Sequence, residues 1–329
     1  MKIHLGLARW LVKPALVLAL AYSVPCLAQT TLTFGYVSKR DSHYGDGVTA
    51  MCTAIEKQTS GRYVCKQVMG GVLGGEKDLV DGVKSGSVDL TMVSSGTVSM
   101  FAPSIGMLDI PFLFRDYAHA RKVLDGAIGE RLLDDLRKAG TAPLAWSENG
   151  FRHMTNNKHA VNAPDDLKGL KVRTMENKVH MAAFKTLGLE PKPLPFPELF
   201  TALQSGAFDG QENPISAILA SKLYVVQKYL TLTAHAYSPA LIIASPKLWN
   251  SLSPADRTIF LDAAKIGAKA TRARVERDER EGVEFIKSQG VQVVTTVDRA
   301  PFVAAMLPAR KQFEQEFGAD KIAAVVAVK

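Results

Sequence analysis

Apolar and polar positions along the first part of the chain repeat with two alternating periods. Runs with the two-residue period of a strand lie at 31–38, 62–69 and 88–95, and runs with helical spacing lie at 43–58 and 76–84. Strands that alternate with helices in this way pair in parallel, because each crossover needs a helix-length connection. The pattern therefore predicts an α/β fold with a parallel sheet covered by helices.

The alternation starts again near residue 150. A helical run over 116–140 is followed by a strand at 141–149, and a second unit begins at Gly150. Its predicted strands are 170–174, 230–237 and 240–245, and its predicted helices are 179–187, 195–206 and 215–229. Two α/β lobes follow. We expect lobe I to contain 29–149 and about 237–277, and lobe II to contain 150–236 and about 278–329.

A segment near the carboxyl end predicts one long helix over 254–289. Ser253 and Pro254 are typical of a helix start, and Gly290 is typical of an end. Unbroken, its 36 residues would span about 54 Å, longer than one small domain. Eight of the ten residues over 272–281 are charged, which suits a solvent-exposed bridge between domains. Two helices with a bend are the alternative, which the absence of Gly and Pro from that stretch disfavours.

The first 28 residues have the pattern of a secretory signal peptide. An apolar run over 14–21 follows three basic residues, Lys2, Arg9 and Lys13. Small residues then lead to a cleavage site after Ala28. A membrane anchor is the alternative, but about a dozen uncharged residues fall short of the roughly 20 that a spanning helix needs. We therefore expect export to the periplasm.

The mature chain, residues 29–329, is mildly basic. Cleavage removes three basic side chains and no acidic one, so the formal charge falls from +8 to +5. Lysines and arginines are scattered and aromatic residues are few, which argues against a nucleic-acid partner. A positive field around a cleft that takes anions explains the charge equally well.

Two cysteines remain after cleavage, Cys52 on a predicted helix and Cys65 on the next strand. In an oxidising compartment a disulfide across this 13-residue separation would stabilise the fold by roughly 3 kcal/mol. Two buried thiols that never meet are the alternative. Neither cysteine belongs to a CxxC pair, so the predicted role is structural rather than redox.

Motifs of enzymes and metal centres are missing from the sequence. There is no HExxH, GxSxG or P-loop motif, and no cluster of Cys and His at metal-ligand spacing. Residues 45–50 fit GxGxxA loosely, but Asp46 stands where a pyrophosphate would approach. We therefore expect a protein that uses no cofactor and is not an enzyme.

Two polar features stand out instead. Arg173 ends the predicted strand 170–174, which would place its guanidinium at the mouth of a lobe. A guanidinium matches a carboxylate with two parallel hydrogen bonds. A surface arginine in a salt bridge is the alternative. The segment FDGQENP, residues 208–214, is either a polar turn or part of the same site.

Residues 165 to about 264 closely resemble the solute-binding proteins of tripartite ATP-independent periplasmic (TRAP) transporters, the DctP-like family. The resemblance rests on DLKGLKVRT, PFPELFTALQSGAFDGQENP, KLYVVQKYL and LSPADRTIFLDAA. Weaker likeness in NGFRHMTNNKHAV and MGGVLGGEKDLVDGVKSGSVDL extends it to nearly the whole mature chain. It implies a two-lobed periplasmic binding protein fold with a long helix spanning both lobes.

The resemblance also implies roles for particular residues. Arg173 would pair with the carboxylate of a ligand, and Asn213 would add a side-chain amide bond to the same group. Arg152, in NGFR, would be a second arginine that can reach the ligand, and Phe196 would pack on the ligand's body. FDGQENP would then be a turn that presents Asn213.

Departures from the family pattern bear on the identity of the ligand. Relative to the sialic-acid-binding members, Val37 replaces a polar residue and Ser94 replaces an acidic one, which argues against sialic acid. Glu76 would bind the hydroxyls of a sugar acid, or would simply begin its helix near the positive end of the helix dipole.

Aromatic residues suggest a different ligand. Tyr36, Trp146, Phe196 and Tyr237 lie near the predicted cleft, so we expect a small organic acid with an apolar or aromatic body.

We therefore expect a periplasmic protein that captures a small organic acid anion by closing about hinges near Asn149 and Tyr237. The resemblance implies that it delivers the ligand to the small and large subunits of a membrane permease driven by an ion gradient. A ligand-sensing partner of a membrane signalling protein and a secreted enzyme are the alternatives.

Overall fold

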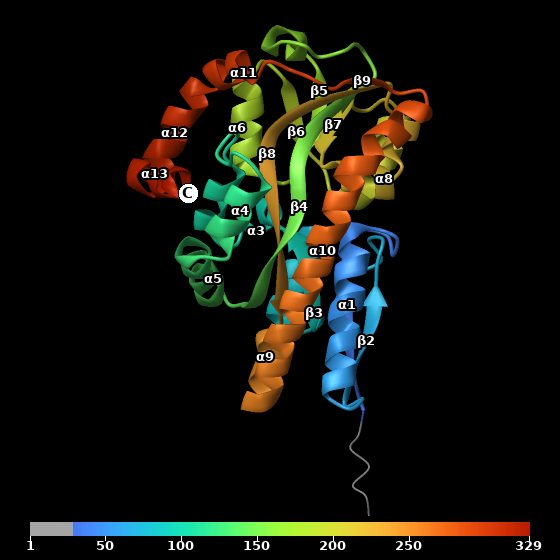
Figure 1. The fold of residues 1–329 in the computed structure, drawn as a ribbon, viewed down its shortest axis with the longest axis vertical. Coiled ribbons are helices and arrows are strands. Elements are labelled where there is room, and N and C mark those ends of the chain that lie inside the picture. Colours follow the sequence, from blue (N-terminus) through green and yellow to red (C-terminus); the bar gives the residue numbers. More distant parts are fainter. Residues whose placement is uncertain (1–28) are drawn as a thin grey trace, which may run out of the picture.

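The structure is a computed structural model that describes residues 29–329 (Figure 1). The predicted signal peptide lies outside the described residues. Within them, every helix is too short or too polar to cross a lipid bilayer.

One mixed sheet of nine strands runs through both lobes in the order β2-β1-β3-β8-β4-β7-β5-β6, with β9 paired to β8. In lobe I, β1 lies parallel to β2 and β3, and in lobe II, β5 lies parallel to β6 and β7. The predicted parallel pairing is therefore confirmed within each lobe, while β4 and β8 join the lobes by antiparallel pairing. The strands are β1 Thr30–Gly35, β2 Tyr63–Val68, β3 Leu90–Ser94, β4 Ala142–Asn156, β5 Lys171–Thr174, β6 Glu190–Pro193, β7 Gly210–Asn213, β8 Tyr229–Ala244 and β9 Gln292–Val294.

Strands β4 and β8 are each continuous across the boundary between the lobes. The sequence pattern predicted that the first would end at residue 149 and the second would be two strands, but both run on for 15 and 16 residues. Their register shifts between Glu148 and Gly150, where Gly150 has a φ of +118°. A non-glycine residue rarely adopts that conformation, so the join between the lobes is a bulge in the sheet.

The long helix α10 runs unbroken over Pro254–Ser288, which confirms the predicted helix to within one residue. Ser253 caps it by accepting a hydrogen bond from the amide of Asp256. It packs on α1 (His43–Gln58) in lobe I and on α8 (Ile215–Ala220) in lobe II, and Figure 1 shows it lying along both lobes.

The charged middle of α10 forms ion pairs with the loops beside it. Arg274 Nη1 lies 2.8 Å from Asp41, and Arg272 Nη1 lies 2.7 Å from Asp125. The prediction that this stretch is exposed to solvent on all sides is wrong on one side, where Val275 and Asp278 are buried; the ion pairs supply partners for its charged residues. The other helices are α2 Glu76–Ser85, α3 Ser95–Val98, α4 Tyr117–Leu124, α5 Ala127–Lys138, α6 Lys178–Thr186, α7 Leu199–Gln204, α9 Pro246–Ser251, α11 Arg299–Ala305, α12 Leu307–Phe317 and α13 Ala319–Ala327, with 3-10 turns η1 Pro103–Asp109, η2 Pro164–Leu167, η3 Phe196–Glu198 and η4 Leu223–Val225.

Two helical predictions are too long. The run over 116–140 divides into α4 and α5, because Asp125 and Gly126 interrupt it. The run over 215–229 ends at Ala220, since Lys222 takes a left-handed φ of +53° and starts a 3-10 turn.

The predicted disulfide is present. Cys52 of α1 is bonded to Cys65 of β2, 13 residues apart.

We expect the Cys52→Ser/Cys65→Ser variant to lose about 3 kcal/mol of unfolding free energy, because the disulfide lowers the conformational entropy of the unfolded chain. Urea denaturation of both proteins measures the loss. Reducing agent should destabilise the wild type by a similar amount and leave the variant unchanged; an unchanged wild type would contradict the role of the disulfide.

Candidate ligand-binding site

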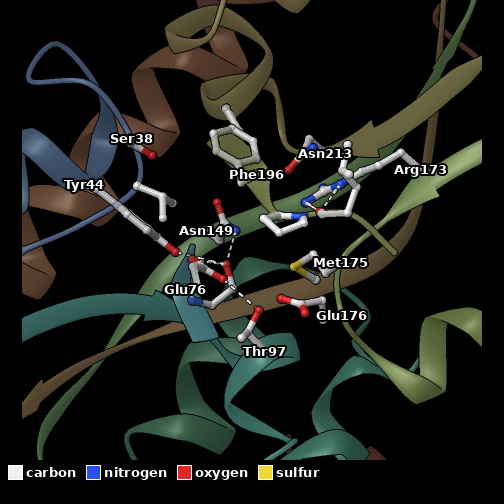
Figure 2. Close-up of a pocket in the computed structure, with 15 residues that line it drawn as sticks. Ser38, Tyr44, Glu76, Thr97, Asn149, Arg173, Met175, Glu176, Phe196 and Asn213 are labelled. Atoms are coloured by element: carbon white, nitrogen blue, oxygen red, sulfur yellow. Dashed lines mark hydrogen bonds between the residues drawn. The ribbon is translucent and has the colours of Figure 1, made fainter. Parts of the chain in front are cut away.

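A cavity lies between the lobes, beyond the carboxyl ends of the parallel strands, with about 460 Å³ of empty space that includes space open to solvent (Figure 2). This is where open α/β sheets place their ligands. Its lobe I side and β4 contribute mostly polar groups: Ser38, Tyr44, Glu76, Ser94, Thr97 and Asn149. Its lobe II side contributes a guanidinium, a carboxylate, an amide and apolar groups: Arg173, Glu176, Asn213, Met175, Leu194, Pro195, Phe196 and Ala217.

Arg173 of β5 is a buried cation, 2% exposed, that lines the cavity. Its Nε and Nη2 donate to the backbone oxygen of Leu194 at 2.8 and 2.5 Å, which fixes the guanidinium, while its Nη1 has no partner in the described chain. No carboxylate of residues 29–329 forms an ion pair with it. Burial lowers the pKa of Arg173 to about 10. The cavity is therefore lined by a buried guanidinium that forms no ion pair within the described residues.

Phe196 covers the same guanidinium. The Arg173 Cζ lies 5.9 Å from the centre of the Phe196 ring, within cation–π range. Phe196 follows β6, whose end places Leu194 and Pro195 on the cavity as well. Around the Arg173 guanidinium, this side of the cavity therefore has an apolar wall of Leu194, Pro195 and Phe196.

Asn213 ends β7 and lines the cavity, but Arg152 does not. Arg152 of β4 is fully buried behind it. Its Nε binds the Glu212 carboxylate, and its Nη2 donates to Glu212 Oε1 at 3.0 Å and to Asn213 Oδ1 at 3.1 Å. The charge of Arg152 is thus already balanced by a side chain.

Glu212 itself is held ionised. Burial alone would raise the pKa of its carboxyl, but Arg152 and His235 outweigh that effect and hold this pKa well below its usual range. The structure therefore places Arg152 as the partner of Glu212 and the support of Asn213, outside the cavity lining where the resemblance put it.

On the opposite side, Glu76 and Ser94 form the centre of a hydrogen-bond network. Glu76 Oε1 accepts from the Ser94 amide at 2.9 Å and from its hydroxyl at 3.0 Å, and Oε2 accepts from Thr97 at 3.0 Å. Asn149 Nδ2 donates to the Ser94 hydroxyl at 3.1 Å, and the Tyr44 hydroxyl lies 3.2 Å from it. Burial raises the pKa of Glu76. Several donors and acceptors thus meet at one end of the cavity, as Figure 2 shows.

His43 holds Asn149 in that network. Its Nε2 lies 2.9 Å from Asn149 Oδ1, and burial lowers the pKa of His43 to about 4. The imidazole is therefore neutral near pH 7, and its Nε2 hydrogen is the donor to the amide oxygen.

Three predicted aromatic residues lie away from the cavity. The Tyr36 hydroxyl donates to Gln67 at 3.1 Å, Trp146 Nε1 donates to the backbone oxygen of Gly129 at 3.1 Å, and the Tyr237 hydroxyl donates to Glu148 at 3.0 Å. Each polar end has a partner in the core, which fixes these side chains as core residues.

Of the predicted site residues, the cavity brings together Arg173, Asn213, Phe196, Glu76 and Ser94.

Sequence reasoning missed several polar lining residues. Tyr44 and Thr97 lie on α1 and α3, just beyond the ends of β1 and β3. Thr97 follows Ser94 by three residues, so one helical turn brings both to Glu76; that spacing was the available signal. Asn149 was predicted only as a hinge.

Two α/β lobes that share a sheet, a bridging helix and a cavity lined from both sides define the class of solute-binding proteins that enclose a small molecule between lobes. The model of the bacterial extracellular solute-binding proteins, family 7 (DctP), matches residues 34–316, and the chain belongs to that family. Its relatives include solute-binding proteins of TRAP transporters, so the predicted family and fold are confirmed.

Three similar proteins illustrate the relationship. A solute-binding protein of Verminephrobacter eiseniae is 49% identical over 88% of this chain and 87% of its own. A TRAP periplasmic solute-binding protein from Polaromonas sp. JS666, solved with D-erythronate, is 52% identical, with a TM-score of 0.91 over 92% of this chain and 99% of its own. One from Bordetella, with density attributed to pantoate, is 45% identical, with a TM-score of 0.90 over 92% and 100%.

Proposed function

We propose that this chain is the periplasmic solute-binding subunit of a TRAP transporter that captures a small hydroxylated carboxylate and delivers it to the small and large permease subunits in the membrane. Binding consists of closing the lobes around the anion, and no bond is made or broken. The lobe limits proposed above, with hinges at the β4 bulge near Asn149 and at Tyr237 opposite it, suit this motion.

The observation that carries this proposal is the unpaired Arg173. A buried cation is costly unless an anion and hydrogen bonds satisfy it. The free Nη1, with the remaining hydrogen of Nη2, presents a planar pair of donors of the kind that a carboxylate accepts. Asn213, which also lines the cavity, supplies a further polar group. Its amide is hydrogen-bonded to Arg152 and Gln211, so it would have to exchange one of these bonds for a bond to the ligand. The ligand's carboxylate belongs at this end of the cavity.

The polar network on lobe I supports hydroxyl groups at the other end of the ligand. Tyr44, Thr97 and Asn149 offer hydroxyl and amide groups, and Glu76 offers carboxylate oxygens. This favours the sugar-acid alternative over an aromatic body, because Tyr36, Trp146 and Tyr237 do not line the cavity. The acids described in the two structural relatives, erythronate and pantoate, each carry hydroxyls beside a carboxylate.

Calorimetry with three four-carbon compounds tests the proposal. D-erythronate carries a carboxylate and hydroxyls, butyrate carries only the carboxylate, and erythritol carries only hydroxyls. We expect the refolded mature chain to bind erythronate, and to bind the other two at least about tenfold more weakly, because each leaves buried polar groups unpaired. Erythritol binding as tightly as the acid would refute the carboxylate site, and butyrate binding as tightly would refute the hydroxyl site.

A further inference from the structure

The loop between β2 and α2, residues 69–75, brings glycines of lobe I against lobe II. Gly71 has a φ of +82° and faces Pro197 of η3. A methyl group at Gly71 would lie 2.5 Å from Cγ and 2.6 Å from Cβ of Pro197. Both atoms belong to a rigid ring, so they cannot rotate away and the two backbones would have to separate.

This contact belongs to a seam that borders the cavity. A methyl group at Gly75, in the same loop, would lie 3.2 Å from Cβ of Pro195, which lines the cavity. On α3, a methyl group at Gly96 would lie 2.6 Å from Cε of Met175, another lining residue. The end of Met175 is flexible and can give way, but the proline ring cannot. The Gly71–Pro197 contact is therefore the least tolerant point of the seam.

We propose that Gly71 is a positioning residue for lobe closure: because it has no side chain, lobe I seats directly on Pro197 and closes the cavity over the bound acid. This inference rests on the proposed function, since it concerns how the same site encloses its ligand. The contact joins the two lobes and is broken when they open. A side chain at position 71 therefore raises the free energy of the closed state more than that of the open state, because the clash with Pro197 exists only when the lobes are closed, whereas the backbone strain is common to both states.

Gly70 provides a matched control for the test. It also has a positive φ, +71°, but a methyl group there would meet no atom within 4 Å. Gly71→Ala and Gly70→Ala therefore carry the same kind of backbone strain, and only the first carries the clash between lobes. We expect calorimetry to give a Kd for D-erythronate about tenfold or more higher for Gly71→Ala than for Gly70→Ala. The ligand-free variants should melt at similar temperatures.

A second substitution separates the clash from a defect in the loop. Pro197→Gly removes both atoms that a methyl group at Gly71 would strike, so the Gly71→Ala/Pro197→Gly variant should bind as tightly as Pro197→Gly alone. Small-angle scattering should show that saturating erythronate compacts Gly70→Ala more than Gly71→Ala.

The outcomes distinguish this inference from the function on which it rests. Equal Kd values for Gly70→Ala and Gly71→Ala overturn the closure role and leave the proposed function standing. A binding defect that persists after Pro197→Gly also overturns it, because the defect then arises within the loop. Failure of the wild type to bind any hydroxy acid overturns the proposed function, and the closure role with it.

Discussion

Replacing Arg173 with alanine is expected to weaken binding of D-erythronate by about 2–5 kcal/mol, roughly 30- to 4000-fold in Kd. The guanidinium is buried, is fixed by Leu194 and has a free Nη1. Alanine would leave the carboxylate of the ligand desolvated and unpaired. The ligand-free variant should be no less stable than the wild type, because it has lost a buried cation that had no counter-ion. Calorimetry and thermal unfolding measure the two effects.

Arg299 offers a matched control for this substitution. Its Nη2 also donates to a backbone oxygen, that of Ala234, at 2.7 Å, and its Cζ lies 5.3 Å from the Phe112 ring. Arg299→Ala therefore removes a similar set of contacts outside the cavity and should leave Kd unchanged. Arg173→Lys should bind with intermediate affinity, since an ammonium keeps the charge but not the planar pair of donors. Equal loss in Arg173→Ala and Arg299→Ala would show that Arg173 does not contact the ligand.

The elements that could be predicted from sequence are those governed by local rules. The long helix α10 begins at Ser253 and Pro254, and its charged middle contains no residue that breaks a helix, so its extent needed no tertiary information. Arg173 was placed in the site because the carboxyl end of a strand in an α/β lobe faces the cleft. Both predictions depend only on where a residue lies along a helix or strand, and the periodicity of apolar and polar residues indicates that position.

The aromatic residues were misplaced because side-chain direction depends on the face of the strand. Val37 lines the cavity whereas Tyr36, its neighbour, bonds to Gln67 in the core, as expected when successive side chains in extended chain point to opposite sides. Trp146 is likewise close to Asn149 in sequence but packs beneath α5. Deciding which face Trp146 and Tyr237 occupy needed the register of β4 and β8. That register arises from long-range pairing and from the register shifts between Glu148 and Gly150 and between Arg152 and Met154.

Replacing Glu212 with glutamine is expected to cost about 3–5 kcal/mol of unfolding free energy, because it leaves the buried Arg152 charge without its partner. The melting temperature should fall by roughly five to eight degrees. Since the pKa of Glu212 is lowered in the folded protein, its stabilisation is present above its unfolded pKa and is lost as the pH falls through the folded one. The difference in unfolding free energy between the wild type and Glu212→Gln should therefore be constant from neutral to mildly acidic pH and should shrink only in strong acid.

Glu279→Gln is a matched control whose effect on stability should change with pH in the opposite direction. Burial raises the pKa of Glu279 to about 7, so its favourable contribution is present below its unfolded pKa and is lost as the pH rises through 7. Relative to the wild type, Glu279→Gln should therefore gain stability between pH 5 and pH 8, as thermal unfolding across that range can measure. A Glu212→Gln variant as stable as the wild type would mean that Arg152 does not depend on Glu212 to balance its charge. The charge of Arg152 would then be free to act on the ligand, and the separation of roles between an internally paired Arg152 and a ligand-binding Arg173 would fail.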